Sequence, residues 1–162
     1  GWELLSAAPD LDTIYVPIGL GSGICSTIQA RDALGRKTEI VGVVAENAPA
    51  YALSLEAGRV ISTNSADTIA DGVACRVPVA DALEIIGKGA ARVIRVSEAE
   101  IKSAMRAYFD DTHNVAEGAG AAGLAAALKD TQRKAGAKVG LILSGGNVDA
   151  EIFAPIIGAA SA

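Results

Sequence analysis

A chain of 162 residues, 51% of them hydrophobic, is long enough to form one domain with its own core. Its formal net charge of −5, and the lack of basic clusters interleaved with aromatic residues, argue against a nucleic-acid partner. No apolar run approaches the roughly 20 residues that span a bilayer. No N-terminal signal pattern is visible either. We therefore expect a cytoplasmic protein without a membrane partner.

In chain order, strand-like and helix-like segments alternate. We expect strands at Thr13–Val16, Glu39–Val44, Arg92–Val96 and Val139–Leu143, with further extended structure at Arg59–Ile61. We expect helices at Gly1–Leu5, Ile24–Leu34, Tyr51–Glu56 and Pro78–Ile86, and another from Ser97 onward. The glycine- and alanine-rich stretch Glu117–Gly123 is expected to lead into an alanine-rich helix that ends at about Lys129. This alternation predicts an α/β fold of three layers, a mostly parallel sheet with crossover helices. The all-apolar run at 139–143 is expected as a central strand.

The helix that follows the strand at 92–96 has the clearest start signal. Ser97 and Glu100 have the spacing of a capping box, in which each side chain bonds the other residue's backbone N–H. Its apolar residues share one face, which we expect to lie in the core: Ile101, Met105, Tyr108 and Phe109.

A glycine-rich loop joins the first strand to the helix at 24–34. Gly19, Gly21 and Gly23 alternate with Leu20 and Ser22. Glycine permits positive φ and close approach of the backbone, so amide N–H groups can converge on an anion at the positive end of the helix. The loop therefore predicts a phosphate site, with the Ser22 hydroxyl as a further donor. The alternative is a tight turn that binds nothing.

A second glycine turn, Ser144–Asn147, follows the apolar run at 139–143. In open α/β sheets, ligands bind at the carboxyl ends of strands, and both glycine turns occupy such positions. The polar stretch 62–72 has no periodicity and is expected as a surface loop that reaches toward this site.

Four segments, taken together and in this order, resemble fold-type II pyridoxal-phosphate enzymes: Val16–Gly23, Ile69–Val73, Glu117–Ala121 and Leu143–Asp149. The resemblance is to threonine and serine dehydratases, with serine racemase a close relative, and it covers roughly Asp12 to Phe153. It implies the large-domain fold of the tryptophan-synthase-β-like enzymes, with pyridoxal 5'-phosphate as cofactor.

The resemblance also implies roles for individual residues. The backbone amides of the first segment would bind the cofactor phosphate: Gly19, Leu20, Gly21, Ser22 and Gly23. Ser144 would hydrogen-bond the pyridine nitrogen. Glu117 would lie near the ring and the substrate. Leu20 departs from the four consecutive glycines more often found in the family, and Gly118 replaces the proline usual after the acidic residue.

Relatives of the serine racemase type hold a divalent cation with two carboxylates and a carbonyl. By resemblance, Glu46 and the carbonyl of Ala50 match two of these ligands, whereas Ala52 stands where a second carboxylate is expected. A hard cation with one charged ligand binds weakly, so this metal site is only a candidate.

The lysine that forms the Schiff base in the family lies in a Ser-x-Lys-x-Arg-Gly-Ala motif, which these 162 residues do not contain. We therefore expect residues 1–162 to be a single α/β domain, the C-terminal part of a longer enzyme. No residue of this part is expected to be catalytic, and the isolated chain is expected to be inactive.

For the complete protein, the resemblance implies a lyase that converts a β-hydroxy amino acid to a 2-keto acid and ammonia by β-elimination, acting as a homo-oligomer. A serine racemase is the nearest alternative. Two hypotheses of other classes stay open: a non-catalytic anion-binding module, and a dinucleotide-binding oxidoreductase domain, since Glu46 lies 23 residues after Gly23.

Overall fold

The computed structural model describes residues 1–158 and contains one parallel sheet of four strands. The strands are β1 (Thr13–Pro17), β2 (Glu39–Ala45), β3 (Arg92–Val96) and β4 (Val139–Leu141). Their order across the sheet is β3-β2-β1-β4, and every neighbouring pair is parallel. The expected mostly parallel sheet is confirmed.

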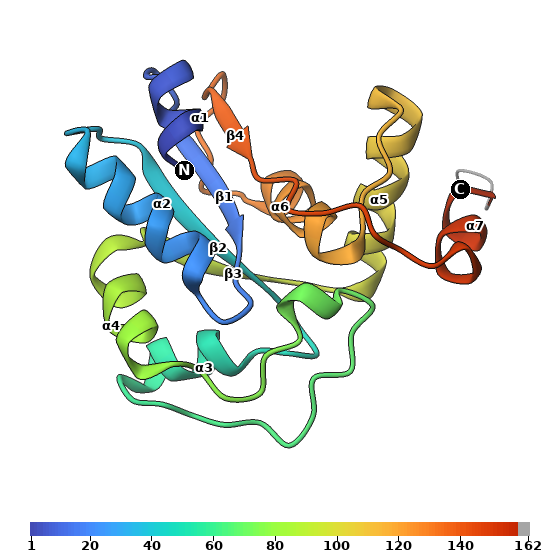
Figure 1. Ribbon diagram of the computed structural model, residues 1–162, viewed down its shortest axis with the longest axis horizontal. Coiled ribbons are helices and arrows are strands. Elements are labelled where there is room, and N and C mark those ends of the chain that lie inside the picture. Colours follow the sequence, from blue (N-terminus) through green and yellow to red (C-terminus); the bar gives the residue numbers. More distant parts are fainter. Residues whose placement is uncertain (159–162) are drawn as a thin grey trace.

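Helices cover both faces of this sheet (Figure 1). One side carries α1 (Trp2–Ala7), α2 (Ser22–Ala33), α3 (Ala50–Ala57) and α4 (Ala80–Gly89); the other carries α5 (Glu98–Thr112) and α6 (Gly118–Lys129), with α7 (Ala150–Gly158) packed on α5. A short 3₁₀ helix, η1 (Asp71–Val73), contacts α6. The three-layer architecture is thus confirmed. None of the helices within residues 1–158 has both the length and the apolar character that a membrane crossing needs.

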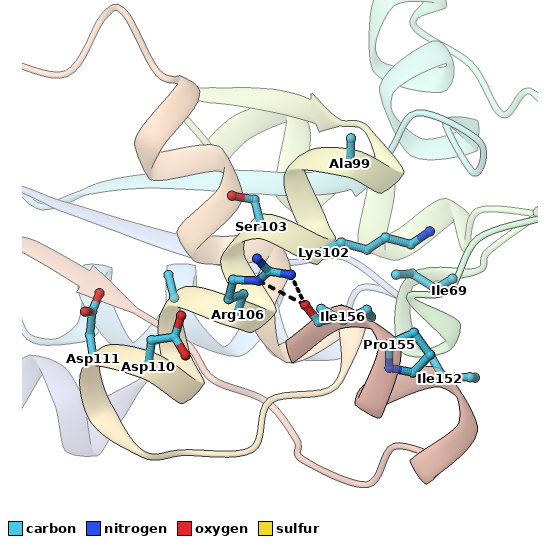
Figure 2. A pocket seen from close by; sticks show the side chains of 11 residues that line it. Ile69, Ala99, Lys102, Ser103, Arg106, Asp110, Asp111, Ile152, Pro155 and Ile156 are labelled. Carbon is cyan, nitrogen blue, oxygen red and sulfur yellow. Dashed lines mark hydrogen bonds between the residues drawn. The ribbon is translucent and has the colours of Figure 1, made fainter. Parts of the chain in front are cut away.

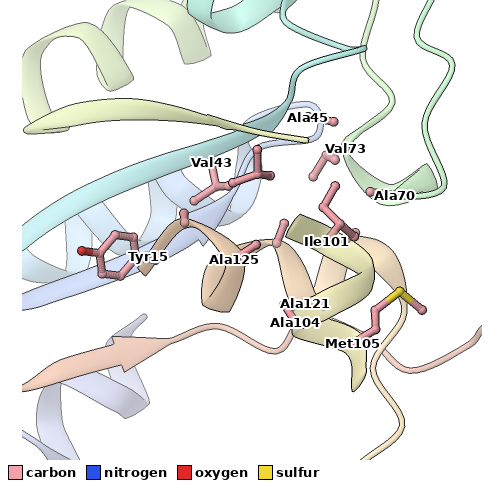
Figure 3. Close-up of a cluster of buried hydrophobic side chains, with 14 of the residues drawn as sticks. Tyr15, Val43, Ala45, Ala70, Val73, Ile101, Ala104, Met105, Ala121 and Ala125 are labelled. Carbon is pink, nitrogen blue, oxygen red and sulfur yellow. The ribbon is translucent and has the colours of Figure 1, made fainter. Parts of the chain in front are cut away.

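Alternation along the strands divides the core into two clusters. Ile14 and Ile40 are fully buried against α2 and its neighbours, whereas Tyr15 and Val41 are fully buried on the α5 and α6 side. Successive side chains of a strand point to opposite faces, so a strand covered on both faces contributes to both clusters. Figure 3 shows the second cluster, in which alanines of α6 lie between β2 and Ile101 of α5. These small side chains let α6 pack against β1, β2 and β3.

The start of α5 is the one predicted from its capping box. The Ser97 hydroxyl accepts from the Glu100 N–H (3.3 Å), and the Glu100 carboxylate accepts from the Ser97 N–H (2.7 Å). Ile101 and Met105 are fully buried, while Tyr108 and Phe109 are half-buried. The predicted apolar face is therefore the face that enters the core.

Three expectations from the sequence are wrong. The segment 139–143 is not a central strand: β4 ends at Leu141 and forms one edge of the sheet. An apolar run indicates that both faces are covered, as they are here by Leu4, Leu11 and α6, but it carries no information on how many strands flank it. Arg59–Ile61 joins no strand of the sheet, and α4 begins at Ala80 rather than at Pro78. Helix α7 was not predicted.

Three hydrogen-bonded side chains, Tyr15, Asp130 and Arg92, link β1, β3 and the end of α6. The Tyr15 hydroxyl donates to Asp130 (2.8 Å), and the Arg92 guanidinium donates to the same carboxylate oxygen (2.5 Å). Burial raises the pKa of Tyr15, and the bond to the Asp130 carboxylate raises it further, to about 12. Burial of Asp130 would raise the pKa of its carboxyl, but the bonds from Arg92 and Tyr15 outweigh burial and lower that pKa below its ordinary value.

Because the Tyr15 hydroxyl ionises less readily in the folded state than in the unfolded state, its contribution to stability is complete below pH 10 and is lost as the pH rises toward 12. The free energy of unfolding should therefore fall with pH in this range, by about 1.4 kcal/mol per pH unit from this residue. Tyr15→Phe should remove that part of the slope, as measured by urea unfolding between pH 8 and 11.5. An identical slope in the two proteins would contradict the assignment.

Candidate functional site

The two glycine turns lie at the same edge of the sheet, because β1 and β4 are parallel neighbours. The loop after β1 leads into α2, and the segment after β4 leads to Ser144. The Ile142 N–H donates to the Tyr15 carbonyl (3.3 Å), which keeps the two chains together beyond the end of β4. The carboxyl ends of adjacent strands thus present both turns to one region.

The loop Gly19–Gly21 and the first turn of α2 form a row of free backbone donors. Among residues 1–158, no N–H group from Gly19 to Ile24 donates to a backbone or side-chain acceptor. The Cys25 N–H is the first to be used, by the Gly21 carbonyl (3.0 Å). Gly21 precedes the helix with φ +98° and ψ −9°, a left-handed conformation that glycine adopts without steric cost. Free amides at a helix N-terminus form a site for an anion.

Neither of the two side chains in this loop lies in the core. Leu20 is 68% exposed, so its side chain lies outside the core, and Ser22 is exposed at the first position of α2. The departure from consecutive glycines at position 20 therefore does not remove an amide donor from the loop.

The four sequence segments that resemble the family meet through close contacts of backbone. A Cβ on Gly19 would overlap the carbonyl oxygen of Gly72. A Cβ on Gly145 would lie 2.7 Å from the Glu117 carboxylate, and the Glu117 N–H donates to the Gly145 carbonyl (3.1 Å). At Gly19 a side chain would have to displace backbone, whereas at Gly145 the Glu117 carboxylate could move aside. The backbone contact of Gly145 is with Gly120, where a Cβ would overlap the Gly145 carbonyl oxygen.

A pocket of about 380 Å³ lies where three of these segments join. Its lining comes from the segment before and at η1, from the start of α6, and from the chain after β4: Ile69, Asp71, Gly72, Glu117, Gly118, Asn147, Val148, Asp149 and Ile152. The pocket is thus built from segments far apart in the sequence, beside the loop whose Gly19 packs on Gly72.

Two polar side chains predicted for this site have no hydrogen-bond partner in the described part of the chain. Ser144 is exposed, and its hydroxyl bonds to no residue within 1–158. Glu117 is half-buried and lines the pocket, and its carboxylate likewise accepts no hydrogen bond from those residues. Both groups are therefore available to a ligand.

The two predicted metal ligands are engaged elsewhere. The Glu46 carboxylate pairs with Lys129 (3.3 Å), and the Ala50 carbonyl accepts from the Ser54 hydroxyl (2.7 Å). Across residues 1–158, no group of three or more histidine, cysteine or acidic side chains has the arrangement of a metal site. The cation near Glu46 stays a prediction.

A larger cavity, of about 920 Å³, lies elsewhere. It lies between α5 and α7, where Arg106 donates to the Ile156 carbonyl (2.9 Å from Nε; Figure 2). None of the predicted site residues lines it. Cavity size alone would therefore have pointed away from the glycine turns.

Sequence reasoning missed one residue beside the glycine loop. The Tyr51 hydroxyl, from α3, donates to the Leu20 carbonyl (2.7 Å) and accepts from the Val79 N–H (3.1 Å). These partners are 31 and 28 residues away along the chain. An aromatic residue in a short helix gives no local signal of such a contact.

Residues 1–145 match the protein family described as pyridoxal-phosphate dependent enzyme. The chain is 34% identical to L-threonine ammonia-lyase of Thermotoga maritima over 157 residues, which cover 97% of this chain and 39% of the relative. It is similar to the crystal structure of a threonine deaminase from T.th. (TM-score 0.84, 33% identity, 91% of this chain, 55% of that chain). It is also similar to the structure of maize serine racemase (TM-score 0.86, 33% identity, 94% and 48%). The chain thus spans about half the length of these proteins or less.

Substitution of Gly21 should weaken binding of an anion more than substitution of another glycine that also has positive φ. In Gly21→Ala, the new Cβ would lie 2.7 Å from the Ala82 Cβ and 3.0 Å from the Tyr51 hydroxyl, so the loop must move. We expect the affinity for inorganic phosphate, measured by calorimetry, to fall by about tenfold or more, equivalent to at least ~1.4 kcal/mol.

Gly58→Ala is the matched control. Gly58 also has positive φ (+65°), but a Cβ there would meet nothing within 4 Å. Both variants should lose about 1–2 kcal/mol of stability through backbone strain, Gly21→Ala should lose more because of its contacts with Ala82 and Tyr51, and only Gly21→Ala should lose affinity for phosphate. Equal phosphate affinity in the two variants would place the anion elsewhere.

Proposed function

The chain belongs to the family of pyridoxal-phosphate dependent enzymes, and from this membership we propose that the complete protein converts a β-hydroxy amino acid to a 2-keto acid and ammonia by β-elimination. The observation that carries the proposal is the row of free amides from Gly19 to Ile24 at the same sheet edge as Ser144. The similarity to an L-threonine ammonia-lyase and to a threonine deaminase supports this reaction over others.

The residues present fit the cofactor of the family. The free amides and the start of α2 match a phosphate, which needs several donors and a positive potential. We propose that Gly19, Leu20, Gly21, Ser22 and Gly23 hold this phosphate. Ser144 would donate to the pyridine nitrogen with its unpaired hydroxyl, and Glu117 would face the ring and substrate from the pocket wall.

When bound, pyridoxal 5'-phosphate supplies an electron sink for the carbanion formed at the substrate Cα. The chain contributes position and electrostatics. Ser144, a neutral donor, does not hold the ring nitrogen protonated as a carboxylate would, which favours loss of the β-hydroxyl over transamination. The Glu117 carboxylate, which accepts no hydrogen bond from residues 1–158, would offer a hydrogen-bond acceptor beside the ring and the substrate.

We propose that the Schiff-base lysine belongs to a part of the enzyme outside these 162 residues. All six lysines of the chain are exposed, so none has the buried surroundings that lower a lysine pKa for this chemistry: Lys37, Lys88, Lys102, Lys129, Lys134 and Lys138. Residues 1–162 would then be one domain that carries the phosphate site and the ring-nitrogen partner.

The comparisons change how we regard two of the alternatives, the dinucleotide-binding oxidoreductase and the racemase. Membership in a family of pyridoxal-phosphate enzymes favours that cofactor over a dinucleotide, so we no longer propose a dinucleotide-binding oxidoreductase. A racemase stays the second candidate because of the similarity to maize serine racemase. An anion-binding module remains our description of the isolated chain. A cytoplasmic homo-oligomer is a further proposal, from the sequence and the resemblance.

The test is an assay of the full-length protein with pyridoxal 5'-phosphate. We expect 2-keto acid and ammonia from L-threonine or L-serine, and no product from residues 1–162 alone. Racemisation of serine without keto-acid formation would favour the second candidate. Keto-acid formation by residues 1–162 at a comparable rate would contradict our placement of the lysine.

Variants of Ser144 test the role of the hydroxyl in the same assay. Ser144→Ala removes one hydrogen bond, worth roughly 0.5–1.5 kcal/mol, so cofactor affinity should fall modestly and turnover should fall more. Ser144→Asp should hold the ring nitrogen protonated and raise transamination relative to elimination. An unchanged ratio of the two reactions in folded, cofactor-loaded Ser144→Asp would contradict the assignment.

A further inference from the structure

Tyr51 lies directly beneath the glycine loop. It is 1% exposed, and its hydroxyl makes two hydrogen bonds: it donates to the Leu20 carbonyl (2.7 Å) and accepts from the Val79 N–H (3.1 Å). Val79 is the residue that precedes α4. A single buried atom therefore joins α3, the loop after β1 and the start of α4.

The bond to Leu20 fixes the direction of the next amide. In a trans peptide the C=O and the N–H point to opposite sides of the same plane, and no peptide bond in residues 1–158 is cis. Because the Leu20 carbonyl points at Tyr51, the Gly21 N–H points away from it. That N–H has no acceptor among the described residues and is one of the free donors of the loop.

The packing behind Gly21 leaves this peptide little freedom. A Cβ at Gly21 would lie 3.0 Å from the Tyr51 hydroxyl and 2.7 Å from the Ala82 Cβ, so the loop rests directly on α3 and α4. The hydroxyl has given its only proton to Leu20, so it has none left to donate to a ligand. Its effect on a ligand must act through the loop.

We propose that Tyr51 is a positioning residue for phosphate recognition: its hydroxyl holds the Leu20–Gly21 peptide with the Gly21 N–H turned toward the phosphate. This inference rests on the proposed function, because it takes the cofactor phosphate as the anion. Loss of the hydroxyl leaves the ring packing in place but lets the peptide rotate, which weakens the contribution of the phosphate to binding. Contacts with the rest of the cofactor are unaffected.

The experiment compares two ligands in the full-length protein, pyridoxal 5'-phosphate and pyridoxal, which lacks the phosphate. In Tyr51→Phe we expect the dissociation constant of the first to rise by about tenfold, on the scale of one or two lost hydrogen bonds. That of pyridoxal should stay within about twofold, and so should kcat at saturating cofactor. Tyr108→Phe is the matched control, since Tyr108 is half-buried on α5 and its hydroxyl bonds to no residue within 1–158.

Each outcome decides the matter. An unchanged preference for the phosphorylated ligand in Tyr51→Phe overturns the inference, and so does an equal loss for both ligands, which a merely structural role would produce. If the wild-type protein itself shows no preference for the phosphate, the proposed function fails first, and this inference with it. Should Tyr51→Phe not fold, the wild-type protein labelled with ¹⁵N-glycine keeps the inference testable, because the Gly21 N–H signal should shift on addition of pyridoxal 5'-phosphate and not of pyridoxal. A Gly21 signal that does not respond to the phosphorylated ligand overturns the inference.

Discussion

The site depends on backbone packed against backbone at the carboxyl edge of the sheet. Gly19 lies so close to the Gly72 carbonyl, and Gly120 so close to the Gly145 carbonyl, that a single Cβ at either Gly19 or Gly120 would separate the segments. Side chains elsewhere determine how strongly the elements pack, but these two contacts determine whether the four segments of the site can lie together. The loop after β1, the chain around η1, the start of α6 and the turn after β4 form one site because no side chain stands between them.

The rest of the fold holds these segments in place. Two core clusters cover the faces of the sheet, and the alanines of α6 let that helix lie close to three strands. The Tyr15–Asp130–Arg92 group links β1 to β3 and to the end of α6. Tyr51 holds the loop from below. Amides fixed before a ligand arrives need not be ordered at the expense of binding free energy.

Patterns that depend on near neighbours in the sequence predicted their elements well. The strand at 92–96, the capping box at Ser97 and the glycine turn into α2 all follow from residues within a few positions of one another. The edge position of β4 could not be predicted in this way, because an apolar run indicates that both faces of a strand are covered but not whether both of its edges pair with other strands. The contact of Tyr51 with the loop could not be predicted either, because its partners are 28 and 31 residues away along the chain. The glycines and the four ordered segments indicated where the site lies. The contacts that orient its backbone became visible only in the three-dimensional structure.

The central proposal is that the free amides of residues 19–23 bind the cofactor phosphate. Amide NMR spectra of the full-length protein labelled with ¹⁵N-glycine test it most directly. The signals of Gly19, Gly21 and Gly23 should shift strongly on addition of pyridoxal 5'-phosphate and little with pyridoxal, while Gly35 and Gly58, whose Cβ directions are open, stay unchanged. Shifts confined to other glycines, with these three unmoved, would contradict the account.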